Sequence, residues 1–161
     1  MDRVWAPWRM KYILGEKAMG CFLCESSEIG VAEETLVLQL TPHSMVIMNR
    51  YPYTSGHLMV TPRRHVSGLH QLGNEEMLDL HETLRQTVKL VQDWATPDGI
   101  NVGMNLGKAA GAGLEEHIHY HIVPRFHGDN NAMNVFGEVR IIPESLIETY
   151  RRLLPEFEKL Q

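Results

Sequence analysis

Short apolar segments separated by turn residues dominate the first part of the chain, and they predict a series of β-strands. The segments are rich in β-branched and long aliphatic side chains, and Pro, Ser and Gly interrupt them, as in strands joined by short turns. They cover residues 35–40, 45–49 and 57–62. Two further strands are predicted at about 100–105 and 117–124. The pattern therefore favours a meander of neighbouring strands.

A helical period replaces this alternation in the middle and near the end of the sequence. Residues 75–94 place apolar side chains three and four positions apart, which predicts a long helix with one buried face. A second amphipathic helix is predicted over residues 144–160, directly after Pro143. Strands joined by short turns together with a few helices indicate the α+β class, an antiparallel sheet with the long helix packed on one face.

The sequence contains no repeat, low-complexity tract or linker, so residues 1–161 are expected to form a single domain. The first 20 residues form an irregular arm in this prediction. A net charge of −5 without a long basic run argues against non-specific nucleic-acid binding. No stretch approaches the roughly 20 apolar residues of a membrane span, and no signal peptide is evident. We therefore expect a cytoplasmic protein, with no nucleic-acid or membrane partner, whose two cysteines stay reduced.

The segment HIHYHIV at 117–123 alternates strictly between histidine and larger apolar or aromatic residues. Alternate residues of a strand share a face, so His117, His119 and His121 are predicted to line one side at about 6.6 Å spacing. The chain has nine histidines, and three at this alternation are not expected by chance. The pattern therefore predicts a site that uses imidazole chemistry.

Two kinds of chemistry fit a row of imidazoles. One is a catalytic zinc held by several histidines. The other is nucleophilic attack by one imidazole on phosphorus, for which a reference pKa of about 6.5 leaves the ring largely unprotonated at neutral pH. No carboxylate follows the histidines until Asp129, which weakens the catalytic-metal alternative.

A glycine-rich segment at 101–113 precedes the histidines, and such backbone can bring amide N–H groups close to a phosphate. The tripeptide Ser-Gly-His at 55–57 opens another predicted strand and can bring His57 to the same cleft. Cys21 and Cys24 have metal-ligand spacing, although CxxC is also a redox motif. The strand–helix context typical of redox CxxC is not evident.

These segments resemble the histidine triad superfamily of nucleotide hydrolases and transferases. The resemblance covers nearly the whole chain: CFLC at 21–24, MNRYPYTSGHLMVTPRRH at 48–65 and GAGLEEHIHYHIVPR at 111–125. The segments WAPWRMKYI, near the start, and GDNNAM at 128–133 resemble one branch, the bacterial diadenosine tetraphosphate phosphorylases.

The resemblance implies a homodimer whose antiparallel sheet continues across both subunits. It makes His119 the nucleophile that forms a transient nucleotidyl adduct. His121, which we also place among the catalytic residues, and His57 would line the phosphate site, and Asn49 would hold the ribose hydroxyls.

In the glycine-rich segment, the resemblance implies that Asn105 and the backbone at Gly111 and Gly113 contact the phosphates. Lys108 is the nearby cation and a candidate to hold orthophosphate. Many members carry Gln or Ser shortly before the first triad histidine, whereas Gly113 and Leu114 stand there in this chain. That difference leaves open which group protonates the leaving phosphate.

In zinc-containing members of the superfamily, the two cysteines join one histidine after a strand and the first triad histidine. The corresponding residues are His65 and His117. Together with Cys21 and Cys24 they imply one structural zinc per chain, closed and tetrahedral, with no open position for water.

The resemblance implies attack on the α-phosphate of an adenine nucleotide or dinucleoside polyphosphate. Phosphorolysis of diadenosine tetraphosphate to ADP and ATP, with orthophosphate as acceptor, is the expected reaction. The alternatives are a purine nucleoside phosphoramidase, a dinucleoside polyphosphate hydrolase, a metalloenzyme and a non-catalytic nucleotide sensor.

Overall fold

The computed structural model describes residues 20–129 and 144–160, and within them five strands form one antiparallel sheet. The strands follow in the order β1-β2-β3-β5-β4 across the sheet. Their bounds are Val37–Leu40 for β1, Ser44–Met48 for β2, Leu58–Pro62 for β3, Gly99–Met104 for β4 and Tyr120–Arg125 for β5. The last strand along the chain therefore lies inside the sheet, between β3 and β4, where both of its neighbours hold it in place.

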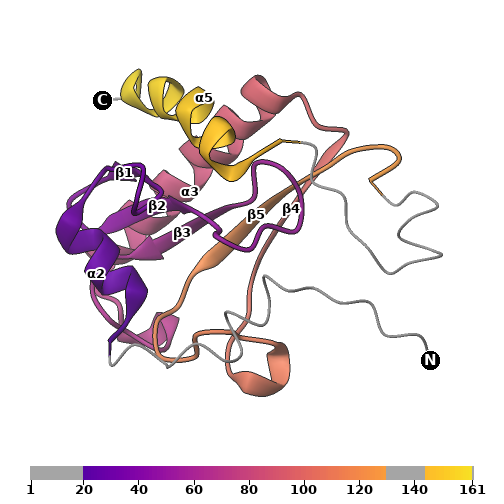
Figure 1. Ribbon diagram of the computed structural model, residues 1–161. Helices are drawn as coiled ribbons and strands as arrows, with labels where there is room; N and C mark the ends of the chain where they lie inside the picture. The colour runs from indigo at the N-terminus through magenta and orange to yellow at the C-terminus, as the bar shows by residue number, and fades with distance from the viewer. Residues whose placement is uncertain (1–19, 130–143, 161) are drawn as a thin grey trace.

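Helices pack against this sheet (Figure 1). The long helix α3, Asn74–Ala95, contacts β2, β3 and β5, and α5, Leu146–Glu158, contacts β1 and α3. A shorter helix α2, Phe22–Ile29, contacts β1. Two 3₁₀ helices, η1 (Leu69–Gln71) and η2 (Lys108–Ala110), lie in the connections before α3 and β5. The buried core consists of apolar side chains from β1, β2, β3, β5, α2, α3 and α5.

The predicted α+β class and the antiparallel sheet with a long helix packed on it are confirmed. Most boundaries differ from the predicted ones by one to three residues. Helix α2 and the 3₁₀ helices were not predicted, because each is too short to show a helical period. Residues 1–19 of the predicted arm and residues 130–133 of GDNNAM lie outside the described residues.

None of the helices in the described part of the chain combines the length and the apolarity that a membrane crossing requires.

The register of β5 decides which of its side chains face α3. The Tyr120 hydroxyl lies 3.3 Å from Nε2 of His81 on α3, so Tyr120 points toward the helix. Adjacent strand residues point to opposite faces, which places His121 on the side away from α3. Met59 of β3 and Gly103 of β4 pair with His121. A Cβ on Gly103 would meet no atom within 4 Å, so the sheet is open beside this histidine.

Candidate functional site

The first two triad histidines precede β5 instead of lying within it, which corrects the predicted strand 117–124. The backbone at Ile118 donates a single hydrogen bond to the Val66 carbonyl, 2.8 Å away, in the loop that follows β3. The three imidazoles therefore do not form one row. His117 turns toward Cys21, whereas the rings of His119 and His121 lie 4.9 Å apart between centroids.

His119 is buried, with 7% of its surface exposed, and its protonation is set by the backbone. Its Nδ1 lies 2.9 Å from the carbonyl oxygen of His117. A carbonyl only accepts, so Nδ1 carries the hydrogen and Nε2 keeps its lone pair in the neutral ring. Burial lowers the pKa of His119, and the hydrogen bond to His117 partly opposes this effect. Neutral His119 therefore has an unprotonated ring nitrogen available for attack.

The Tyr53 amide, His57 and His121 form a chain of two hydrogen bonds beside His119. The Tyr53 amide donates to Nδ1 of His57 at 3.1 Å, so the His57 proton must lie on Nε2. That nitrogen is 3.0 Å from Nδ1 of His121, to which it donates. His121 then carries its own proton on Nε2. The His117 carbonyl and the Tyr53 amide thus determine which ring nitrogen carries the proton in His119, His57 and His121.

Burial also keeps these rings uncharged. Desolvation lowers the pKa of His57 to about 3, and repulsion from His121 and His119 adds to it. Desolvation and the same repulsion from His119 lower the pKa of His121 to about 4. At neutral pH both rings are neutral hydrogen-bond donors and not cations.

Asn49 lies against the same histidine pair. Its backbone N–H donates to the His57 carbonyl at 3.0 Å, and its Oδ1 accepts from the Tyr51 amide at 2.8 Å. The amide orientation follows, and it places Nδ2 at 3.5 Å from Nε2 of His57. The structure therefore brings Asn49, His57, His119 and His121 together, as the sequence predicted for a shared cleft.

The glycine-rich segment is folded on itself. The Asn105 side chain donates to the Gly111 carbonyl at 3.5 Å, and Gly107 and Gly111 have positive φ angles of 79° and 89°. Gly113 is exposed, and Lys108 is exposed on η2. Among the described residues, no hydrogen bond joins Lys108 to a histidine, so the structure does not bring this predicted anion ligand into the imidazole group.

Sequence reasoning missed two features that hold His57 in place. The Tyr53 ring lies 4.6 Å from the His57 ring and 6.1 Å from the His121 ring, between centroids. The turn before His57 approaches β5 closely: Thr54 Oγ1 donates to the Pro124 carbonyl at 2.9 Å, and Gly56 has a φ of 77°. The glycine at position 56, directly before His57, was the available sequence signal, whereas nothing in the sequence distinguished Tyr53.

Four side chains from separate parts of the chain form a second group, beside the imidazoles. The ligand atoms of Cys21, Cys24, His65 and His117 all lie within 4.8 Å of one another. Cys24 Sγ is 3.5 Å from Nδ1 of both histidines. Nε2 of His117 donates to the Pro62 carbonyl at 2.8 Å, which leaves Nδ1 free as a ligand. These four residues can therefore hold a metal ion.

The thiol chemistry agrees with a metal site better than with a redox pair. Burial raises the pKa of Cys24 to about 11, with further contributions from Cys21, Glu28 and Glu25. A redox-active cysteine needs the opposite shift, because the thiolate is the reactive form. A cation between the sulfurs would reverse the shift and displace the protons.

The HIT domain family matches residues 31–128, a range that includes all nine histidines of the sequence and therefore the whole triad. This chain belongs to that family. The HIT match begins after Cys21 and Cys24, so the cysteine half of the metal group lies outside it.

Proteins similar to this chain within the HIT family include two enzymes and one zinc-bound structure. The AP-4-A phosphorylase of Mycobacterium tuberculosis is 34% identical over 168 residues, covering 99% of this chain and 86% of that protein. The bis(5'-adenosyl)-triphosphatase of Dictyostelium discoideum is 36% identical over 101 residues, covering 62% of this chain and 66% of that protein. The crystal structure of a Zn-bound histidine triad family protein from Mycobacterium smegmatis has a TM-score of 0.67 at 26% identity, covering 88% of this chain and 96% of that one. The resemblance to the superfamily and to its phosphorylase branch is confirmed.

Proposed function

We propose that this chain is a phosphorylase that converts diadenosine tetraphosphate and orthophosphate to ADP and ATP through a covalent adenylyl-histidine intermediate on His119. The observation that carries the proposal is the fixed tautomer of His119: Nδ1–H is bound to the His117 carbonyl, and Nε2 keeps its lone pair. The similarity to an AP-4-A phosphorylase along nearly the whole chain supports the choice of substrate.

The proposed reaction has two displacements at the α-phosphorus. Nε2 of His119 attacks this atom, the bond to the bridging oxygen breaks, and ATP leaves. An oxygen of orthophosphate then attacks the same phosphorus, the P–N bond breaks, and ADP forms while His119 returns to its neutral state. A nucleophile that splits one difficult displacement into two easier ones is the general advantage of covalent catalysis.

The surrounding donors have roles that follow from their protons. Negative charge builds on the phosphoryl oxygens during each displacement, and fixed N–H donors stabilise it. The Nε2–H of His121 and the Nδ2 amide of Asn49 are available donors, since their other hydrogen-bonding atoms are already used. Of these two available donors, His121 binds the phosphoryl oxygens in our proposal, whereas Asn49 binds a ribose hydroxyl and does not stabilise the charge. Asn105, Gly111 and Gly113 contact the polyphosphate.

We also propose that Cys21, Cys24, His65 and His117 bind one zinc ion per chain. Two thiolates and two imidazole nitrogens form a closed tetrahedral set, which is typical of structural zinc. Such an ion would neutralise the thiolates and join α2 to the rest of the fold. A homodimer and a cytoplasmic location complete the proposal.

The acceptor decides between phosphorolysis and hydrolysis. Purified protein incubated with diadenosine tetraphosphate and orthophosphate should yield ADP and ATP, separated and quantified by ion-exchange chromatography. Orienting the phosphate in line can supply up to about 7–11 kcal/mol of the barrier, which lets it compete with water. We expect Lys108→Ala to raise the phosphate concentration needed for half-maximal rate. Equal rates without phosphate, with AMP as product, would identify a hydrolase, and nucleotide binding without turnover would identify a sensor.

A further inference from the structure

The loop between β3 and α3 carries His65, the one metal-group residue with an exposed surface, and the chain on both sides of His65 is tied down. Before it, the Pro62 carbonyl accepts from Nε2 of His117. After it, the Val66 carbonyl accepts from the Ile118 amide at 2.8 Å. The loop is thereby connected to the segment that holds the other histidine of the metal group.

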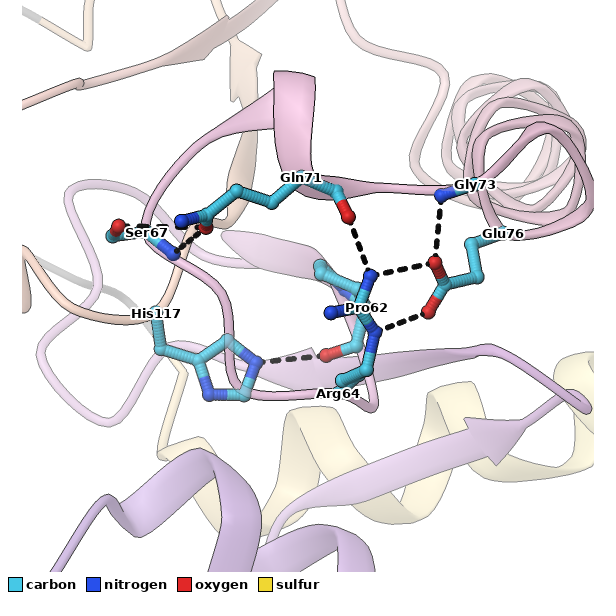
Figure 2. Close-up of polar contacts among 7 residues, drawn as sticks. All are labelled: Pro62, Arg64, Ser67, Gln71, Gly73, Glu76 and His117. Carbon is cyan, nitrogen blue, oxygen red and sulfur yellow. Dashed lines mark hydrogen bonds and ion pairs between the residues drawn. The ribbon is translucent and has the colours of Figure 1, made fainter.

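A branched ion pair holds the same loop to the start of α3, as Figure 2 shows. Arg64, the residue before His65, donates from Nε and Nη2 to the two carboxylate oxygens of Glu76 at 2.7 and 2.8 Å. Its Nη2 also donates to the Gln71 carbonyl at 2.6 Å. The Glu76 carboxylate accepts in addition from the Gly73 amide at 2.8 Å, where α3 begins. One guanidinium therefore connects the end of β3, the loop and the first turn of α3.

The Gln71 side chain holds the part of the loop that follows His65 and Val66. Its Oε1 accepts from the backbone amide of Ser67 at 2.9 Å (Figure 2). The same atom accepts from the backbone amide of Gly68 at 3.2 Å. The loop thus satisfies several of its polar backbone groups through side chains that do not belong to the metal group. An isolated exposed ion pair contributes little to stability. An Arg–carboxylate contact with two hydrogen bonds, however, fixes the relative orientation of the two side chains, which a single bond does not.

This arrangement bears on metal binding, because His65 depends on its loop for its position. His117 is fully buried, and a hydrogen bond to the Pro62 carbonyl fixes its ring. For His65, the contact is between its Nδ1 atom and Sγ of Cys24, 3.5 Å away. If the loop were free, ordering it would oppose metal binding. Residues that orient metal ligands without touching the metal change its affinity by roughly 10–100-fold.

We propose that Arg64 and Glu76 are positioning residues for the metal ligand His65, and that they raise the affinity of the four-residue group for zinc. The inference rests on the zinc site proposed above. The pair acts through the loop, and neither side chain is a metal ligand itself.

The test compares zinc affinity, measured by competition with a colorimetric chelator, in wild-type protein and in Glu76→Gln and Arg64→Lys. Gln at 76 can still accept from the Gly73 amide, so the helix start is kept while the charged two-bond contact is lost. Lys at position 64 keeps the positive charge but cannot form the two parallel hydrogen bonds that a guanidinium makes to a carboxylate. We expect each variant to bind zinc about 10–100-fold more weakly. The matched control is Glu82→Gln, which removes the Arg85–Glu82 pair of the same chemistry from α3 and should leave affinity unchanged.

A double-mutant cycle with His65→Ala separates positioning from general destabilisation. If Glu76 acts through His65, Glu76→Gln has no further effect on affinity once His65 is gone. In the Co²⁺-loaded protein, Glu76→Gln should also alter the visible ligand-field bands that report tetrahedral coordination, while Glu82→Gln should not. The same loss of affinity with and without His65, or variants that bind like wild type, would overturn this proposal alone. Wild-type protein that binds no zinc would overturn the metal site and this inference together.

Discussion

Backbone groups select different tautomers for chemically identical imidazoles in this molecule. The carbonyls of Pro62 and His117 each accept from a ring nitrogen, and the Tyr53 amide donates to one. None of these backbone groups can titrate, so the tautomers they select persist over the whole range in which the rings are neutral. His117 is left with a free Nδ1 and His119 with a free Nε2. In our proposal the same residue type is thereby a metal ligand at one position and a nucleophile two residues later.

Removal of the nucleophile is the direct test at this scale. His119→Ala should lower kcat for diadenosine tetraphosphate by several orders of magnitude, because the neighbouring rings of His57 and His121 carry their protons on Nε2, while nucleotide binding persists. His121→Ala removes a donor and should cost less. Turnover is measured by product chromatography and binding by calorimetry with AMP. Near-normal turnover in the His119→Ala protein would exclude the covalent mechanism.

The buried, uncharged His57 predicts how stability depends on pH. Its pKa is about 3 in the folded protein, against about 6.5 in an unfolded chain. Below pH 6.5 the unfolded chain binds a proton that the folded protein excludes. The free energy of unfolding therefore falls as pH drops from 6.5 toward 3, by up to about 1.4 kcal/mol per pH unit for one such group. His121 and His119 are the titratable groups that lower this pKa, and the Tyr53 amide and Asn49 are its polar neighbours.

Urea unfolding at several pH values between 7 and 4.5 measures this dependence. His57→Gln should make the slope of stability against pH shallower by about one proton. The metal group is present in both proteins, so its own pH dependence cancels in the comparison. His70→Gln, at an exposed histidine on η1, serves as control and should keep the wild-type slope. An unchanged slope in His57→Gln would show that the unfolded and folded chains bind protons alike at this residue.

Which residues would approach one another was partly predictable from the sequence. Strand alternation and the Ser-Gly-His element placed His57, His119 and His121 in one region, and CxxC spacing indicated a metal site. The resemblance separated His117 from the other two by assigning it to the zinc set, but strand alternation alone did not. The break in the strand before Tyr120 involves the hydrogen bond between Ile118 and Val66, a contact between segments distant in sequence.

At the scale of elements, the length of each helix determined whether the sequence pattern could predict it. Helix α3 has 22 residues, enough turns for its apolar period to be unambiguous, and it was predicted to within one residue at each end. Helix α2 has 8 residues and begins directly after Cys21, so its two turns show no clear period. Its position depends on long-range contacts, among them those of Cys21 and Cys24 with His117.

Loss of the metal should therefore loosen α2 in particular. Cys24→Ser replaces a thiolate with a poor zinc ligand, and the purified variant should lose the one zinc per chain expected in wild type, as measured by atomic emission. Its melting temperature should fall by several degrees, since each kcal/mol lost corresponds to about 2–4 °C in a chain of this size. Wild-type protein stripped of metal while folded should keep residual catalysis, because the proposed ion would not contact substrate. Metal-free wild-type protein from an unchelated preparation would contradict the zinc site.

At the scale of the whole molecule, the two edges of the sheet differ. Edge strand β1 contacts α2 and α5, whereas no residue of β4, the other edge, is fully buried in the described structure. Val102 on β4 is 45% exposed, and Leu106 just after it is 51% exposed. An uncovered edge with apolar side chains is a template for pairing with another strand. Pairing of two β4 strands would continue the sheet across a homodimer and leave the histidine face of each chain open beside Gly103.

This arrangement predicts a dimer that a single charge on β4 weakens. Sedimentation velocity of wild-type protein should give a mass of twice the chain mass of 18.4 kDa. Val102→Lys places a charge on the edge, which natural sheets use to prevent strand pairing, and should shift the protein to monomer. Leu78→Lys is the control, because Leu78 on α3 is 73% exposed and lies away from β4, so this variant should stay dimeric. A monomeric wild type would remove the continuous sheet from the proposal, and a dimeric Val102→Lys protein would place the interface on another surface.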